Sequence, residues 1–440
     1  MRSHRALPLA VALALAALNL AGPLPSARAQ EAEAPATGLR VALDRVLAEH
    51  AFLIIEVMRL GLEGGPEFEA AADTLDANTE DLIGAIAGIY GEAAGDAVGV
   101  QWRNHIAFIV DYARALADED TSAAGVADQQ LRRYVADFSA LLSGAIAPLP
   151  QEAVEGLVQE HIDQLEQVAA FDAADFGDAY PAVRATYDHM FMIGDGLALG
   201  IVNQFPDRFT GGPNAFSPAT DMRLTLDRLL GEHTALASLA MRASLTDAPD
   251  EAAAADALAD NTGALADTIG GIYGAEAGAA FSDLWTRHTG LYIDYVAATR
   301  AGDAAGQRAA RDGLADYSSD FTAFLASANP FLSASSFEGL VGAHTEHLLD
   351  QVDAYADGDY VAAYRIGREG FAHTGVISAG LAAAIVDQFP QRFPDAAMAP
   401  QADPEGRGTV IVGLATLGVL GALSAASVAS ARRRRRALGG

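Results

Sequence analysis

Histidine is the residue type in this chain whose number and spacing point most clearly to chemistry. The sequence contains ten histidines and no cysteine. Eight of the histidines recur at matched positions in two copies of one pattern, and an asparagine recurs with them. The first copy holds His50, Asn78, His105, His161 and His189, and the second holds His233, Asn261, His288, His344 and His373. Such regular placement indicates a shared role for these side chains.

The two copies form a tandem duplication. Residues 43–58 and 226–241 both carry apolar residues at helical spacing, with His50 and His233 in the middle of the stripe. An offset of 183 residues relates most of the two copies, and one inserted residue makes it 184 for His189 and His373. Each histidine is therefore expected to lie on the buried face of a helix.

Turn-forming clusters divide each copy into regular segments. The first three histidines of each copy are 55 and 56 residues apart, and Gly-, Pro- or Asp-containing clusters lie about 14 residues after each of these histidines and again about 14 residues before the next. No alternating strand pattern of any length occurs. The sequence predicts an all-α fold of two tandem six-helix bundles, each made of three hairpins with helices of roughly 20–28 residues.

Helix geometry predicts that the histidines share one level of each bundle. A residue 14 positions from a turn lies about 21 Å along the helix axis. The four histidines and the asparagine of each copy all have this separation from a turn, so we expect them to form a buried polar layer. Buried polar groups without partners cost about 1–3 kcal/mol each. The layer must therefore bind an ion or water, or form hydrogen bonds within itself.

Neutral imidazole is the ligand form for zinc, copper, iron and nickel, and burial favours the neutral form. The layer residues are accordingly the predicted metal ligands, with copper or zinc favoured because no thiolate is present. A layer that serves only as hydrogen-bonded core is the alternative. The chain lacks HExxH, a helical ExxH, GxSxG, a P-loop and CxxC, which excludes the metal and nucleophile sites that these motifs build.

The two ends of the chain have the patterns of an export signal and a membrane anchor. Residues 1–29 combine arginines, an apolar stretch and a small-x-small cleavage pattern. Residues 409–430 carry no charge and are long enough to span a bilayer, and an arginine-rich tail follows. The positive-inside rule places this tail in the cytoplasm and the bulk of the chain outside the cell membrane. Removal of the C-terminal segment as a sorting tail is the alternative.

The sequence therefore predicts seven segments. These are a signal peptide at 1–29, helical repeat domain 1 at 39–209, a linker at 210–219, helical repeat domain 2 at 220–393, a linker at 394–408, a transmembrane helix at 409–430 and a cytoplasmic tail at 431–440. Because the first linker is rich in glycine and proline, we expect the two domains to unfold independently.

The charge of the chain excludes nucleic acid as a partner. There are 28 basic residues, all of them arginine, against 58 acidic residues, and the formal net charge is −30. Nine of the arginines lie in the predicted signal or from residue 407 onward, so the region between them is more acidic still. Such a surface repels nucleic acid and anionic lipid, and it keeps the protein soluble.

Four short motifs occur in both copies. They are LDxxLxEH at residues 43–50, a Tyr-Gly pair at Tyr90, a Trp–His–Tyr pattern at residues 102–112, and QFPxRF at residues 204–209. Together they resemble a group of secreted bacterial helical proteins that is often labelled "copper amine oxidase-like". True copper amine oxidases need an N-Y-D/E tyrosine and an H-x-H copper motif, and this chain has neither. The resemblance implies copper by name, and it does not imply oxidase activity.

Taken together, these patterns predict an exported, membrane-anchored protein that binds copper or zinc in each of its two repeats, with no catalytic residue identified. One alternative is a non-catalytic cell-surface structural or adhesion protein whose histidines are hydrogen-bonded core residues. Another is a haem protein with two histidine ligands. Protein partners are not specified by the sequence.

Overall fold

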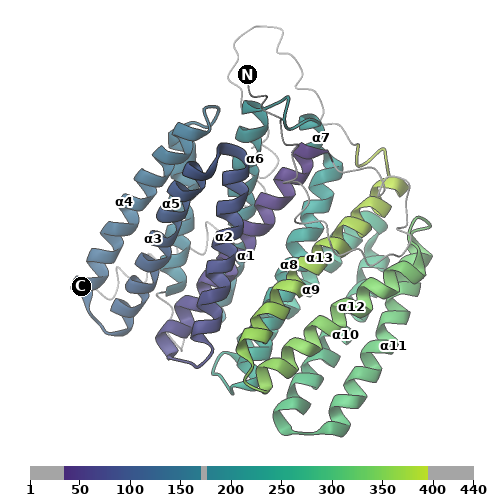
Figure 1. The fold of residues 1–440 in the computed structure, drawn as a ribbon. Helices are drawn as coiled ribbons and strands as arrows, with labels where there is room; N and C mark the ends of the chain where they lie inside the picture. The colour runs from purple at the N-terminus through teal and green to yellow at the C-terminus, as the bar shows by residue number, and fades with distance from the viewer. Residues whose placement is uncertain (1–33, 170–175, 395–440) are drawn as a thin grey trace, which may run out of the picture. The chain divides into compact units, whose positions relative to one another are not determined.

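The computed structural model describes residues 34–169 and 176–394, and within these ranges it is built of helices with no strand, which confirms the all-α prediction. Figure 1 shows the helices of the first repeat lying together, and likewise those of the second. The first repeat contains α1 (Pro35–Glu63), α2 (Phe68–Tyr90), α3 (Glu92–Ala117), α4 (Thr121–Ala145), α5 (Gln151–Ala169) and α6 (Phe176–Gln204). After the short α7 (Gly212–Ala215), the second contains α8 (Pro218–Leu245), α9 (Glu251–Tyr273), α10 (Ala275–Ala301), α11 (Ala304–Ala328), α12 (Ala334–Ala356) and α13 (Tyr360–Gln388).

Local sequence signals explain where several helices begin and end. The Asp120 carboxylate accepts hydrogen bonds from two backbone N–H groups in the first turn of α4, and Asp303 does the same for α11. A single residue, Gly91, joins α2 to α3, and Gly274 joins α9 to α10. These glycines have φ of 93° and 98°, a region that other residues rarely adopt. Both repeats thus use the same signals at equivalent positions.

The helices of each repeat pack as antiparallel neighbours with an inner group of three. In the first repeat α1, α3 and α5 contact one another, while α2, α4 and α6 pack against them from outside. In the second repeat α8, α10 and α12 form the corresponding inner group. Each inner helix carries one histidine of the predicted layer.

The apolar core is divided by the histidine level in the second repeat. Leu230, Trp285 and Val341 belong to one buried cluster. Leu236 and Leu348, which are later in the same inner helices, belong to another. His233, His288 and His344 lie between these two sets of residues along their helices. In the first repeat the buried residues on both sides of the histidines join into one cluster.

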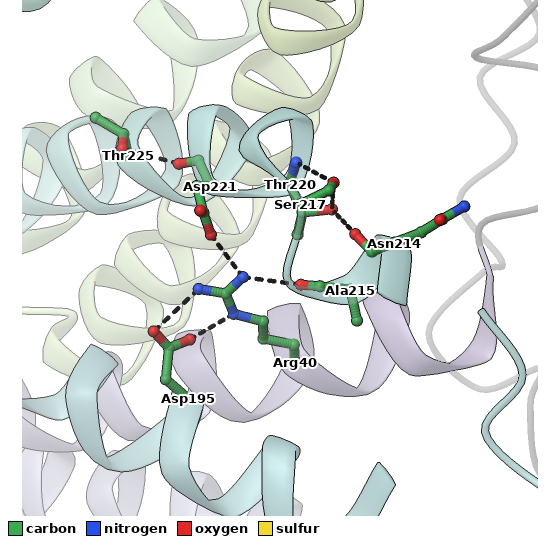
Figure 2. A network of polar contacts seen from close by, with 8 residues as sticks. All are labelled: Arg40, Asp195, Asn214, Ala215, Ser217, Thr220, Asp221 and Thr225. Atoms are coloured by element: carbon green, nitrogen blue, oxygen red, sulfur yellow. Dashed lines mark hydrogen bonds and ion pairs between the residues drawn. The ribbon is translucent and has the colours of Figure 1, made fainter. Parts of the chain in front are cut away.

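The segment between the repeats is held by one arginine of α1. Figure 2 shows the buried Arg40 guanidinium donating to Asp195 of α6, to the Ala215 carbonyl of α7 and to Asp221 of α8. The last two of these contacts are 2.8 and 2.7 Å long. The predicted linker at 210–219 therefore contains α7 and the start of α8, and it is fastened to the first helix of the chain.

Two sets of reciprocal ion pairs join the repeats. Arg184 of α6 binds Glu232 of α8, and the equivalent Arg368 of α13 binds Glu49 of α1, each at 2.8 Å. The second set pairs Arg59 with Asp250, and the equivalent Arg242 with Glu67 at 4.0 Å. In a two-fold interface, whenever a residue of one half contacts a residue of the other half, the equivalents of these two residues also contact each other. The interface between the repeats therefore has two-fold character, as in a homodimer.

These contacts place both repeats in one compact unit. The interpretation of residues 39–209 and 220–393 as independently unfolding domains stays a prediction, and the buried charge between the repeats gives a physical reason to expect coupled unfolding. The predicted signal peptide at 1–29, the linker at 394–408 after its first residue, the transmembrane helix at 409–430 and the tail at 431–440 lie outside the described residues. Among those described, α13 has the length and composition to cross a membrane, but half of its most apolar window is buried in the structure, as in a core helix.

Candidate metal centre

Three histidines of the first repeat meet at the centre of its inner helices. His50 comes from α1, His105 from α3 and His161 from α5, and one ring nitrogen of each lies within 4.8 Å of the others. The Nε2 atoms of His50 and His105 are 3.2 Å apart. All three side chains are buried, with 0–3% of their surface exposed. This is a donor set of three imidazoles that can hold one metal ion.

The second repeat builds the same group from equivalent positions. His233 of α8, His288 of α10 and His344 of α12 also place one ring nitrogen each within 4.8 Å of the others. Their ring centroids are 5.5–5.8 Å apart. We call these groups the first and the second histidine triad.

Aromatic rings hold each triad in place. The Tyr134 ring stacks on His105 with a centroid distance of 4.8 Å and an angle of 18° between the planes. Trp102, one turn before His105 on the same helix, contacts His50 at a centroid distance of 4.5 Å. In the second triad, Tyr317 stacks on His288 at 4.8 Å. The imidazoles are therefore fixed by packing before any ligand binds.

Most ring nitrogens of the triads have no hydrogen-bond partner within the described residues. Both nitrogens of His161, His233 and His344 are buried without a partner, and so is Nδ1 of the other three triad histidines. Buried polar atoms are almost always hydrogen-bonded in folded proteins, so such a concentration of exceptions requires an explanation. A metal ion between the three rings would give one ring nitrogen of each histidine a partner.

Burial keeps the triad imidazoles uncharged at neutral pH. Desolvation lowers the pKa of His105 to about 3, and that of His288 to about 4, from the usual 6.5. The pKa of His50 is well below 6.5 because of burial, and secondarily because of the neighbouring His105 and His161. His161, His233 and His344 are shifted in the same direction for the same reasons. Neutral imidazole is the form that binds a metal.

The structure does not bring His189 and His373 into the triads. His189 lies on α6 and His373 on α13, which are outer helices, and the Nε2 of each is 2.9 Å from a backbone carbonyl, of Leu157 and Leu340 respectively. His189 and His373 lie at the same level along their helices as the triads. Because they are on outer helices, however, their side chains face the backbone of a neighbouring helix. In the second repeat the His373 ring also lies near His347, with a centroid distance of 5.3 Å and an angle of 35° between the planes.

The two asparagines that were predicted as metal ligands form hydrogen bonds to glutamates at the interface between the repeats. The Nδ2 of Asn78 donates to Glu49 at 2.8 Å and to the Val46 carbonyl at 3.0 Å. Asn261 makes the equivalent bonds to Glu232 and the Leu229 carbonyl. Glu49 and Glu232 directly precede the first histidine of each triad and are the residues that bind the arginines of the other repeat. The asparagine nitrogens therefore orient a carboxylate, and their carbonyl oxygens remain buried without a partner.

Sequence reasoning missed the arginines that complete this arrangement. Arg184 and Arg368 occupy equivalent positions of the duplication, and this was the signal that could have identified them. Their partners lie in the other repeat, and periodicity within one repeat gives no information about such contacts. The consequence is that each carboxylate beside a triad is already neutralised by an arginine.

Comparison with known proteins adds no assignment. No family model, curated protein or solved structure matches this chain.

Proposed function

We propose that this protein is an exported, membrane-anchored metal-binding protein that holds one copper or zinc ion in each histidine triad. The observation that carries the proposal is that three separate helices of each repeat bring one ring nitrogen per histidine within 4.8 Å of the others, in triads where most ring nitrogens are buried without a partner among the described residues. The export and anchoring part rests on the sequence patterns at 1–29 and 409–430. Membership in the "copper amine oxidase-like" group belongs to the same proposal.

The charge balance of the site favours copper, carried as Cu(I). Each triad supplies three neutral donors, and no carboxylate belongs to the group of ligand atoms. The nearby Glu49 and Glu232 are already paired with arginines. Burying an uncompensated charge in an apolar core is costly, and the Born cost grows with the square of the charge. A monovalent ion is therefore accommodated more easily than Zn(II) or Cu(II).

The packing argues against the two alternative functions. A haem with two histidine ligands needs a porphyrin between its imidazoles, whereas the triad rings pack at centroid distances of 5.2–6.2 Å in the first repeat. A purely structural layer would be expected to satisfy its own hydrogen bonds. His50 and His105 do face each other at 3.2 Å, but at least one ring nitrogen of every triad histidine has no partner in the part of the chain that the structure describes.

Metal analysis of the purified full chain in detergent tests the proposal. Wild type is expected to bind two ions per chain, and His105→Ala or His288→Ala to bind one, because each change removes a ligand from a single triad. Binding to the native state must also raise the melting temperature. His347→Ala serves as the matched control, since His347 lies outside both triads and its loss leaves the metal content unchanged.

The opposite outcome has a clear signature. If the triads are structural, wild type gains no thermal stability from copper or zinc at concentrations far above micromolar. His105→Ala then costs about 2–4 kcal/mol whether or not metal is present, because it leaves a void and unpaired neighbours. That result would end the metal-binding proposal.

A further inference from the structure

A cavity of about 40 Å³ lies against the second histidine triad. His288 and His344 form part of its wall, and Trp285 and Tyr317 form another part. The remaining lining residues are apolar except for Thr374, and every lining residue is less than a tenth exposed. A cavity of this volume has room for roughly three water-sized spheres. No charged side chain lines it, so it is unsuited to a free ion.

Two hydrogen-bond donors in the cavity wall have no partner within the described residues. These are the indole Nε1 of Trp285 and the hydroxyl of Tyr317, both buried. A buried donor without an acceptor costs about 1–3 kcal/mol. A molecule in the cavity that carries an acceptor atom removes this cost.

The two repeats differ in one side chain that bears on the volume of this cavity. Position 374 is threonine, whereas the equivalent position of the first repeat is the fully buried Met190. The Thr374 hydroxyl donates to the Phe371 carbonyl at 2.7 Å, within its own helix, so its hydrogen is committed there. Phe281 is larger than its counterpart Val98, and the cavity exists in spite of that added volume. Among the positions that line the cavity, 374 is the one where the second repeat has the shorter side chain.

We propose that the second repeat binds a small uncharged gas molecule, of the class of dioxygen and carbon monoxide, as the fourth ligand of its metal ion. This inference rests on the proposed metal site. Three imidazoles leave one position of a tetrahedral ion open, and two of the three line the cavity. The wall is mostly apolar, as a gas ligand requires, and it includes Trp285 and Tyr317, whose buried donors have no partner among the described residues. Water or a larger substrate is the competing occupant.

Xenon binding to the metal-free full chain tests the cavity without the metal, because dry apolar cavities take up xenon. Saturable uptake by wild type, followed by xenon NMR, is the expected result. Thr374→Met places the side chain of the first repeat in the cavity and should abolish this uptake, with Thr374→Leu as a second filling variant. Thr374→Val keeps the volume and should keep binding. No saturable uptake by wild type, or uptake unchanged in both filling variants, overturns the proposal.

Carbon monoxide added to the Cu(I)-loaded chain tests the ligand position. We expect two copper ions but one carbon monoxide per chain, with an infrared band that Thr374→Met removes and that Tyr317→Phe shifts. Copper in both triads with no carbon monoxide band overturns the proposal while the metal site stands. Failure to bind copper overturns the metal site and the gas-ligand role together, and the xenon measurement then shows the empty cavity separately.

Discussion

At the scale of single residues, buried neutral imidazole makes stability depend on pH in a defined direction. The pKa of His105 is about 3 in the folded chain, against a usual value of 6.5. Between these values the unfolded chain binds a proton that the folded chain does not bind. The free energy of unfolding of the apoprotein therefore falls as the pH drops below 6.5, by about 1.4 kcal/mol per pH unit for each such histidine.

His105→Gln isolates this effect. We expect the variant to gain stability relative to wild type by about 1.4 kcal/mol for every pH unit below 6.5, because glutamine does not titrate. Denaturant unfolding of the metal-free proteins at several pH values measures the difference. The buried Asp44, whose pKa is raised chiefly by desolvation, shifts the balance in the opposite direction, but it is present in both proteins and cancels. A constant difference across this range would contradict the assigned pKa.

At the scale of helices, the sequence predicts well how far along a helix a histidine lies, and it predicts poorly which way that side chain points within the bundle. The rise per residue fixes how far a side chain lies from a turn, so His50, His105 and His161 could be placed at one level from turn signals alone. The same reasoning placed His189 with them. Which helices are inner depends on how the six pack, and on the second repeat that covers α1 and α6. His189 therefore shares the level and faces a backbone carbonyl instead.

The glycines that join α2 to α3 and α9 to α10 allow a test of the backbone conformation at these connections. Gly91 and Gly274 adopt positive φ with ψ near 160°, a region essentially restricted to glycine. Gly91→Ala and Gly274→Ala should each cost about 1–3 kcal/mol in chemical unfolding. Gly84→Ala is the matched control, because Gly84 lies within α2 and a Cβ added there meets no other atom within 4 Å, so alanine should stabilise the helix by up to about 1 kcal/mol. Equal effects at all three sites would contradict the strain argument.

At the scale of the whole molecule, the duplication behaves as a fused two-fold dimer. The sequence shows the duplication, but it gives no sign that the equivalent arginines reach across to the other repeat. A Gly/Pro-rich segment favoured separate domains by composition. In the structure that segment is fastened by Arg40, and further arginines pair with carboxylates of the other repeat, namely Arg45, Arg59, Arg184, Arg228, Arg242 and Arg368. Tertiary contacts of this kind leave no periodic signal in the sequence.

The crossing ion pairs lead to a prediction about cooperativity. Removing Arg368 leaves Glu49, which is 9% exposed, with Asn78 as a neutral partner. We expect Arg368→Ala to cost about 2 kcal/mol, less than for a fully buried pair because the arginine side chain is 26% exposed. Arg184→Ala should cost a similar amount, since it breaks the equivalent pair. Because both changes weaken one shared interface, the full chain should still unfold in a single transition that shifts as a whole.

Calorimetry of the metal-free chain measures this, and Arg365→Ala provides the control on the same helix. Arg365 pairs with Glu369 one turn away on the exposed face of α13, and loss of such a pair costs about 0.5 kcal/mol or less. If the repeats unfolded independently, wild type would show two transitions. Arg368→Ala would then lower at most one of them, either that of the repeat that contains Glu49 or that of the repeat that contains Arg368. A single transition lowered by Arg184→Ala and Arg368→Ala, and unmoved by Arg365→Ala, means that burial of paired charge between the repeats holds both histidine triads in one cooperative unit.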